Sequence, residues 1–182
     1  MGSTVYSMDI PASVEKIGSK AFYETRYEST FLNGEFAIVG GGVLYKYNGN
    51  ADEVTLPASV KHIGEDAFAY HDNLTSVTIP EGVQDIGGGA FYKCSSLSKI
   101  ELPDTIKSIN VGAFTGCTSL KTVVTGSGIE NISDHAFYDC DQLSAFYGQP
   151  DSYTEQYAKA NGIYFEAIAA AETEAAETPS EK

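Results

Sequence analysis

One unit of 23 residues recurs along most of this chain. Its clearest copy occupies residues 74–94 and reads LTSVTIPEGVQDIGGGAFYKC. An Ala-Phe pair returns at the same place in each copy, with its ring at Phe22, Phe68, Phe91, Phe114 and Phe137. Only the interval from the first ring to the second spans two steps. A fixed period of about 20–50 residues with many positions in phase indicates a solenoid, in which each unit forms one coil.

Each copy is expected to contain two short strands. Residues 74–79 end in an alternation of polar and apolar side chains, which is typical of a strand with one buried face. Pro80 ends this strand, because proline has no N–H to donate to a neighbouring strand. A second apolar pair, Val83 and Ile86, predicts another strand or extended segment.

A small residue follows the second strand in every copy. Glycine and asparagine tolerate the left-handed backbone conformation, so we predict a left-handed turn at this position. The Ala-Phe pair that comes next predicts a tight corner of one helical turn, with the ring inside the coil. The column of small residues consists of Gly18, Gly64, Gly87, Asn110 and Ser133.

A single coil cannot bury its apolar face, but stacked coils cover one another. Equivalent strands of successive coils should pair in parallel about 4.8 Å apart. The sequence therefore predicts a β-rich solenoid with short parallel strands and helical corners over residues 1–168. Val5, Met8 and Ile10 already fit the first-strand pattern. We therefore expect the chain to be cut from a longer array.

Residues 30–55 replace one copy of the repeat. Apolar runs at 31–32, 36–39 and 43–47 are separated by Asn33-Gly34 and by three glycines. Asn-Gly between apolar runs is a strong hairpin signal. This segment predicts an inserted three-stranded β-meander.

Residues 148–168 are predicted to be a C-terminal cap. Ser152 and Glu155 have the spacing of a capping box that opens a helix. Residues 163–168 predict one last strand, and together these elements would cover the open end of the stack. The Ala/Glu-rich residues 169–182 predict a disordered tail.

The chain is strongly acidic, with a net charge of −14 and 11 basic residues that never cluster. Such a surface repels nucleic acid and disfavours an anionic membrane surface. No apolar run reaches the length of about 18 residues that a membrane-spanning helix needs. The first ten residues contain no secretion signal. Either the protein stays inside the cell or this chain is a mature fragment.

Cys94, Cys117 and Cys140 stand one repeat apart and form a single column. Zinc ligands are usually paired two to four residues apart, and this sequence has no such pair. Stacked Cβ atoms about 4.8 Å apart lie beyond the roughly 3.5–4.5 Å of a disulfide. We therefore expect three buried free thiols and neither a metal nor another cofactor.

Histidines and acids form no catalytic pattern. His71 takes a cysteine position, and His62 and His135 are expected on the surface. The sequence has neither a nucleophile elbow nor a phosphate-binding loop, so we expect no enzyme. Acidic pairs fall at the predicted corners, where carboxylates cap turns, and a weak calcium site is the alternative. These pairs are Glu65 with Asp66 and Asp139 with Asp141.

Twelve tyrosines and no tryptophan raise the question of a sugar-stacking surface. Tyr23, Tyr92 and Tyr138 share a column, but Ala69 and Thr115 interrupt it. We expect these rings to be half-buried at the corners with the hydroxyl in water. A sugar-stacking surface is the alternative.

Two outward columns remain on the first strands. A parallel sheet presents such columns as a nearly flat or concave grid, and solenoids use these grids for binding. Their variety from coil to coil suits an irregular protein surface better than a repeating polymer, and a solvated face without ligand is the alternative. The columns contain Ser76, Lys99, Thr122 and Ala145, and Thr78, Glu101, Val124 and Tyr147.

The motif L-x-x-V-x-I-P-x-x-V-x-x-I-G-x-x-A-F-x-x-C resembles the BspA-type bacterial leucine-rich repeat. The segments FAIVGGGVLYKYNG and SYTEQYAKANGI are similar to pieces that accompany those repeats. The resemblance covers roughly residues 5–168 and implies a leucine-rich-repeat solenoid. The sequence departs from the motif at Thr125-Gly126 in place of Ile-Pro, and at Thr25 and His71 in place of Cys.

The resemblance also implies a function. Proteins of this type are secreted or attached to the bacterial surface, and adhesion to host or neighbouring-cell proteins is their usual role. We therefore expect a non-catalytic, extracellular protein-binding module that is a monomer. A structural spacer that holds another domain away from the cell surface is the alternative.

Overall fold

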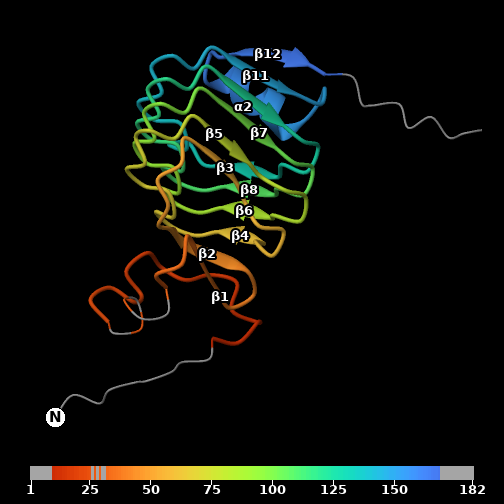
Figure 1. Ribbon diagram of the computed structural model, residues 1–182. Coiled ribbons are helices and arrows are strands. Elements are labelled where there is room, and N and C mark those ends of the chain that lie inside the picture. Colours follow the sequence, from red (N-terminus) through yellow and green to blue (C-terminus); the bar gives the residue numbers. More distant parts are fainter. Residues whose placement is uncertain (1–9, 26, 28, 30–31, 169–182) are drawn as a thin grey trace, which may run out of the picture.

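The computed structural model describes residues 10–25, 27, 29 and 32–168. In this part of the chain the repeats wind into a solenoid of about five turns, each coil stacked on the one before (Figure 1). The hairpin of β1 (Phe36–Val39) and β2 (Val43–Tyr47) lies toward one end of the stack, and the helix α2 (Tyr153–Ala160) lies at the other. The solenoid predicted from the repeat is confirmed.

The second strand of each repeat joins a six-stranded sheet. Its register follows the repeat, because His62 pairs with Asp85 and Asp85 pairs with Ser108. All pairs are parallel except the hairpin of the first two strands. In spatial order the strands are β1 (Phe36–Val39), β2 (Val43–Tyr47), β4 (His62–Ile63), β6 (Asp85–Ile86), β8 (Ser108–Ile109) and β10 (Asn131–Ile132).

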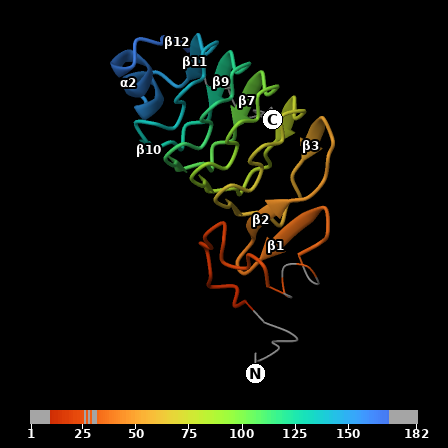
Figure 2. The ribbon, with the colours of Figure 1, turned by 90° about the vertical axis from the view of Figure 1, so that its left-hand side faces the viewer.

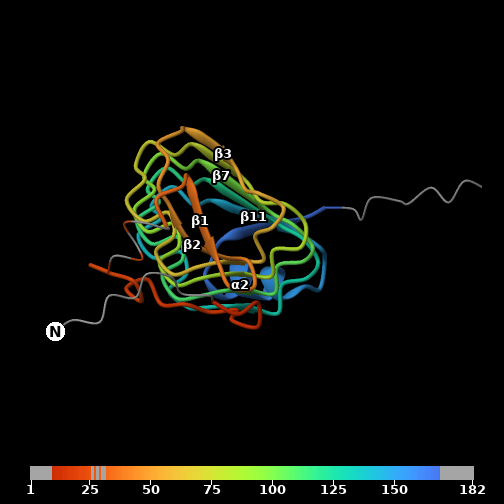
Figure 3. The same ribbon diagram turned by 60° about the horizontal axis from the view of Figure 1, so that its bottom comes forward.

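The first strand of each repeat lies on another side of the coils (Figure 2). The strands there form a two-stranded and a four-stranded parallel sheet. Figure 3 shows β3 (Glu53–Thr55), β7 (Lys99–Leu102) and β11 (Ala145–Gly148) following one another along this side. The two-stranded sheet contains β3 (Glu53–Thr55) and β5 (Ser76–Thr78), and the other contains β7 (Lys99–Leu102), β9 (Thr122–Thr125), β11 (Ala145–Gly148) and β12 (Tyr164–Ala167).

The phenylalanine column forms a file of stacked rings through the core. Centroids of Phe68, Phe91, Phe114 and Phe137 follow one another at 5.1, 5.1 and 5.0 Å. The rings are nearly parallel, with interplanar angles of 10°, 5° and 1°. Rings one repeat apart therefore take the same place in successive coils, as predicted.

The inserted segment is a hairpin, so the prediction of three meander strands is wrong. Strands β1 and β2 pair antiparallel, and the turn between them uses Gly40 and Gly42 at positive φ. Leu32 lies in a bend, and Phe31 is outside the described residues. β2 then pairs in parallel with β4, so the hairpin supplies the strand that the missing coil would have given.

The glycine column has a different role from the one predicted. None of its described members has positive φ. At Gly87 an added Cβ would come within 2.6 Å of the Gly64 carbonyl carbon, so small size permits close contact between coils. A left-handed residue lies six positions after this column in each copy, at Glu24, Tyr70, Lys93, Gly116 and Asp139. Three copies have a second one two positions after the column, at Asp66, Gly89 and Gly112.

The C-terminal segment folds as a helix and a strand. Helix α2 (Tyr153–Ala160) begins after Ser152, whose hydroxyl accepts a hydrogen bond from the Glu155 N–H at 3.3 Å. Tyr157 of this helix packs on Phe146, with ring centroids 5.9 Å apart. Strand β12 pairs with β11. The predicted helix-strand cap is therefore present over the last coil, and residues 169–182 lie outside the described part.

The first copy of the repeat does not form a regular coil. Residues 10–25 contain turns and no strand, so the strand expected at Ile10 is not observed; Val5 and Met8 lie outside the described residues. Phe22 is buried against Tyr45 of β2, with ring centroids 5.1 Å apart. The first copy thus packs on the hairpin through a second, smaller core.

Candidate strand-face binding site

The outward side chains of the first strands form the candidate site, which we call the strand face. Backbone pairing places Lys99 beside Thr122 and Glu101 beside Val124. The next strand continues both rows with Ala145 and Tyr147. Ser76 and Thr78 lie on the neighbouring sheet. The two predicted columns are therefore physical rows of side chains.

Four further residues extend these rows. Glu53 pairs with Ser76 and Thr55 pairs with Thr78. The 23-residue step could have found both, because each stands one step earlier. At the other end, Tyr164 and Glu166 continue the rows. They follow a helix that breaks the repeat, so no spacing in the sequence indicates them.

The exposure of the rows changes along the stack. Ser76, Thr78, Lys99 and Glu101 are exposed, whereas Thr122, Val124 and Tyr147 are half-buried. Ala145 is 7% exposed, so its predicted outward exposure is wrong. Its methyl group lies between the longer side chains of Thr122 and Tyr164, which flank it in register.

A groove of about 400 Å³ crosses the strand face between β5 and β7. Backbone hydrogen bonds join Thr75 N to Asp52 O at 2.7 Å and Lys121 N to Ser98 O at 2.9 Å. Among the described residues no such bond joins Ser98 to Thr75, and β5 and β7 are not paired. The groove therefore marks a break in the sheet, and Ser76, Thr78, Lys99 and Glu101 line it.

The charges at this groove are accessible. Lys99 and Glu101 form an ion pair on one strand, and their side chains are 53% and 67% exposed. An exposed pair of this kind contributes at most about 1 kcal/mol to stability. The Lys99–Glu101 ion pair can therefore break at little energetic cost, so that both charged groups can contact a binding partner instead.

The three cysteines are buried free thiols, as expected. Each thiol donates a hydrogen bond to a phenylalanine carbonyl of the preceding coil, at 3.2 Å for Cys94 and 3.1 Å for Cys117 and Cys140. Burial raises the pKa of Cys94 and Cys140 from 9.0 to about 12, and it raises the pKa of Cys117 as well. Neutral buried thiols of this kind are neither nucleophiles nor metal ligands.

The prediction that His62 is exposed is wrong. Its side chain is buried, and Nδ1 lies 2.5 Å from Oδ2 of Asp85 on the next coil. His135 is exposed, as expected. Ser108 follows Asp85 along the same row, so the acid lies between serine and histidine. In a catalytic triad the histidine occupies the middle place, so this row is not one.

Two of the tyrosines also differ from expectation. Tyr23 and Tyr138 are 62% and 59% exposed instead of half-buried, and Tyr92 is half-buried.

Within the described residues, no group of three or more histidine, cysteine, aspartate or glutamate side chains has the geometry to hold a metal ion. No helix in the same part of the chain has both the length and the apolar character to cross a membrane.

The fold and the strand face define the class of this protein, a leucine-rich-repeat solenoid. A model of the BspA type leucine-rich repeat region matches the chain in six copies, over residues 1–86 and 41–160. The chain therefore belongs to the BspA-type leucine-rich-repeat family. No curated protein sequence matches it.

Solved structures of bacterial leucine-rich-repeat proteins are similar to it. The Treponema pallidum (T. pallidum) protein TpLRR is 36% identical over 52% of this chain and 44% of its own, with a TM-score of 0.51. A protein from Eubacterium ventriosum is 26% identical over 77% of this chain and 41% of its own, with a TM-score of 0.52. The chain thus spans less than half the length of both.

A third structure supports the fold alone. The pneumococcal vaccine antigen PcpA is 18% identical over 89% of this chain and 56% of its own, with a TM-score of 0.54. Its similarity over most of the present chain agrees with a solenoid built from the same kind of coil.

Proposed function

We propose that this chain is a non-catalytic module of a secreted or surface-attached bacterial protein, and that it binds a host or neighbouring-cell protein through the strand face. Proteins with this type of repeat are typically found at the cell surface. Leucine-rich-repeat solenoids generally act as protein-interaction scaffolds. If this chain binds a protein in the same way, one of its surfaces must distinguish that partner from other proteins.

The observation that carries the proposal is the chemistry of the strand face. Its rows hold hydroxyl, charged, aliphatic and aromatic side chains that differ from one coil to the next. The groove between β5 and β7 adds a depression lined by both charges of the Lys99–Glu101 pair. A protein epitope is irregular in the same way, whereas a structural spacer needs no variation of this kind.

Substitution on the strand face tests the proposal. Purified chain is passed over immobilised extracellular-matrix and serum proteins, and each interaction is measured by biolayer interferometry. The variant with Lys99→Glu and Tyr147→Ala reverses one charge and removes one ring of the face. We expect it to bind at least about tenfold more weakly, a loss that corresponds to ~1.4 kcal/mol.

Lys107→Glu is the matched control. Lys107 is 53% exposed, as Lys99 is, and it also forms an ion pair with a glutamate, Glu130. It lies beside β8, on the other sheet. The proposal requires this control to bind like wild type. If the strand-face variant also keeps every interaction, the chain acts as a monomeric spacer instead.

A further inference from the structure

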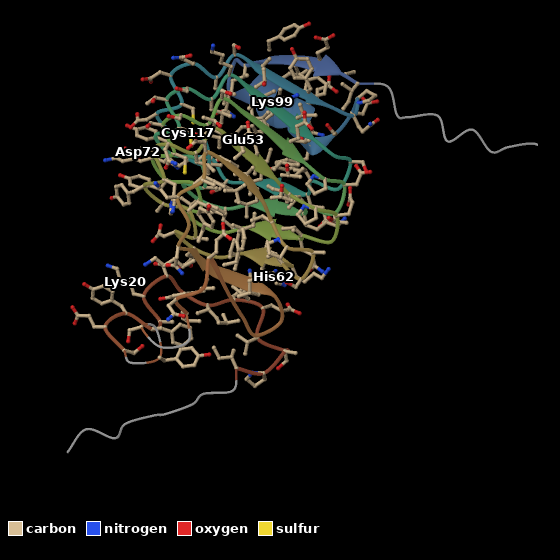
Figure 4. The ribbon with its side chains drawn as sticks, viewed as in Figure 1. Lys20, Glu53, His62, Asp72, Lys99 and Cys117 are labelled. Atoms are coloured by element: carbon tan, nitrogen blue, oxygen red, sulfur yellow. The ribbon has the colours of Figure 1, made fainter. Side chains whose placement is uncertain are left out.

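A second surface of the molecule is hollowed and does not belong to the strand face. A depression of about 840 Å³ lies at the corners of the coils, where the first copy meets the solenoid. Its lining comes from residues 19–23, 45–46, 65–70, 89–92 and 111–115. Figure 4 shows Lys20 at this corner side of the molecule, away from Lys99 on the strand face. We call this depression the corner hollow.

Tyrosine rings line the corner hollow with much of their surface in solvent. Tyr70 is 67% exposed and Tyr23 is 62% exposed. The ring of Tyr92 meets that of Tyr70 at 83°, with centroids 5.3 Å apart. Aromatic surface left in water is available to a partner, because covering it gains free energy. Tyr23 and Tyr70 therefore offer exposed aromatic surface to a ligand in the hollow.

Three lysines lie near these rings, although the whole chain has a net charge of −14. The ammonium group of Lys93 lies 5.7 Å from the Tyr70 centroid and 5.3 Å from the Tyr92 centroid. Lys20 and Lys46 line the hollow itself. None of these three lysines takes part in the ion pairs found among the described residues. Their charge is thus available to an anion.

Hydrogen-bond acceptors complete the hollow. Glu65 and Asp66 line it, and both carboxylates are exposed. A ligand that fits must bring apolar faces for the tyrosines, an anionic group for the lysines and hydroxyl donors for the two carboxylates.

We propose that the corner hollow binds an acidic saccharide, a sugar chain that carries carboxylate groups. Sugar rings offer flat C–H faces to the Tyr70 and Tyr92 rings, and the sugar carboxylate pairs with Lys93. The remaining hydroxyls donate to Glu65 and Asp66. A neutral sugar leaves the lysines without a counter-charge, and an acidic polypeptide such as poly-L-glutamate has no hydroxyl groups to donate to Glu65 and Asp66.

Titration calorimetry with three probes tests the proposal. The probes are a hyaluronan hexasaccharide as the acidic sugar, chitohexaose as the neutral sugar and poly-L-glutamate as the acidic polypeptide. We expect the hexasaccharide to bind the wild-type chain more tightly than either of the others. Its affinity should fall with added salt, because salt screens the contacts between exposed charges.

Substitution of Tyr70, which lines the hollow, or of Lys93, which lies over the Tyr70 and Tyr92 rings, should weaken binding of the hexasaccharide. We expect Tyr70→Ala and Lys93→Gln each to lower its affinity about tenfold. Tyr138→Ala and Lys121→Gln are the controls, because both side chains are exposed, neither lines the hollow, and no cation–π contact found among the described residues joins Lys121 to Tyr70 or Tyr92. They should bind like wild type. The strand-face variant with Lys99→Glu and Tyr147→Ala should also retain the sugar, which separates this site from the proposed protein-binding function.

Three results would overturn the assignment. One is that the wild-type chain fails to bind the hexasaccharide. Another is that chitohexaose or poly-L-glutamate binds as tightly as the hexasaccharide. The third is that Tyr70→Ala and Lys93→Gln bind it with unchanged affinity, while circular dichroism shows that both variants are folded.

Discussion

The imidazole Nδ1 of His62 lies 2.5 Å from the carboxylate Oδ2 of Asp85, one repeat further along the chain. The side chains are 7% and 17% exposed, so the contact is largely shielded from solvent. It joins β4 to β6 by a side-chain bond in addition to their backbone pairing. The next coil has Ser108 in this row, so the bond is specific to one junction of the stack.

Breaking this contact should destabilise the solenoid. A double-mutant cycle with His62→Ala and Asp85→Ala, followed by urea unfolding at pH 7, measures the coupling. We expect about 1–3 kcal/mol, because hydrogen bonds that involve charged groups contribute that much. The same cycle on Gln84 and Lys107, exposed residues of neighbouring coils, should give a coupling close to zero. A coupling near zero for His62 and Asp85 as well would contradict the prediction.

The ring file predicts a large loss of stability when one ring is removed. Phe91 lies between Phe68 and Phe114 and is completely buried. Phe91→Ala should lower the free energy of unfolding by ~3–5 kcal/mol, because it leaves a cavity that the neighbouring coils cannot fill. Tyr138→Ala removes a ring of similar size from the surface and should change stability by less than about 0.5 kcal/mol. Equal effects of the two substitutions in chemical denaturation would show that the file is not the core of the stack.

The buried thiols predict a loss of stability at alkaline pH. Burial raises the pKa of Cys94 from 9.0 to about 12, so the folded chain keeps a proton that the unfolded chain releases above pH 9. The contribution of this thiol to the free energy of unfolding is therefore fully present below pH 9, and it is lost as the pH rises toward 12. The contribution of this thiol should fall by about 1.4 kcal/mol per pH unit within that range.

Comparison of Cys94→Ala with wild type isolates this effect. Unfolding in urea with reductant, at pH 8 and at pH 10, should show the wild-type advantage shrinking by roughly 1.4 kcal/mol. Leu97→Ala removes a buried side chain that has no proton to lose, so its difference from wild type should stay constant. A Cys94→Ala difference that also stays constant would count against the thiol as the cause.

The left-handed corners predict a substitution that stabilises the protein. Asp139 has φ 55°, whereas glycine already occupies the equivalent position at Gly116, with φ 76°. Asp139→Gly should raise the free energy of unfolding by about 0.5–1 kcal/mol, because glycine adopts this conformation without a steric penalty. Asp141→Gly, at an exposed residue without positive φ, should lower stability slightly. Thermal unfolding of the two variants should therefore shift in opposite directions.

The repeat by itself determined which side chains face inward on the strands. Val77 and Ile100 alternate with polar neighbours, Val123 stands one further step of the repeat along, and all three are buried. Alternation and period are local properties of a sequence, and stacking turns each column into a row. For this reason the ring file, the thiol column and most of the strand face were predictable.

Only the tertiary structure decided the features that depend on what lies beside a coil. The break between β5 and β7, the contact of His62 with Asp85 and the close approach at Gly87 arise between neighbouring coils. The corner hollow exists because the irregular first copy packs on the hairpin next to regular coils.

A period in the sequence specifies that coils stack, because each must cover the apolar face of the next. It does not specify how closely each pair of coils approaches, since that distance is set by the particular side chains between them. If successive coils were not stacked in register, the side chains that form the strand face and those that line the corner hollow would no longer lie side by side. The candidate sites of this protein are therefore properties of the assembled stack.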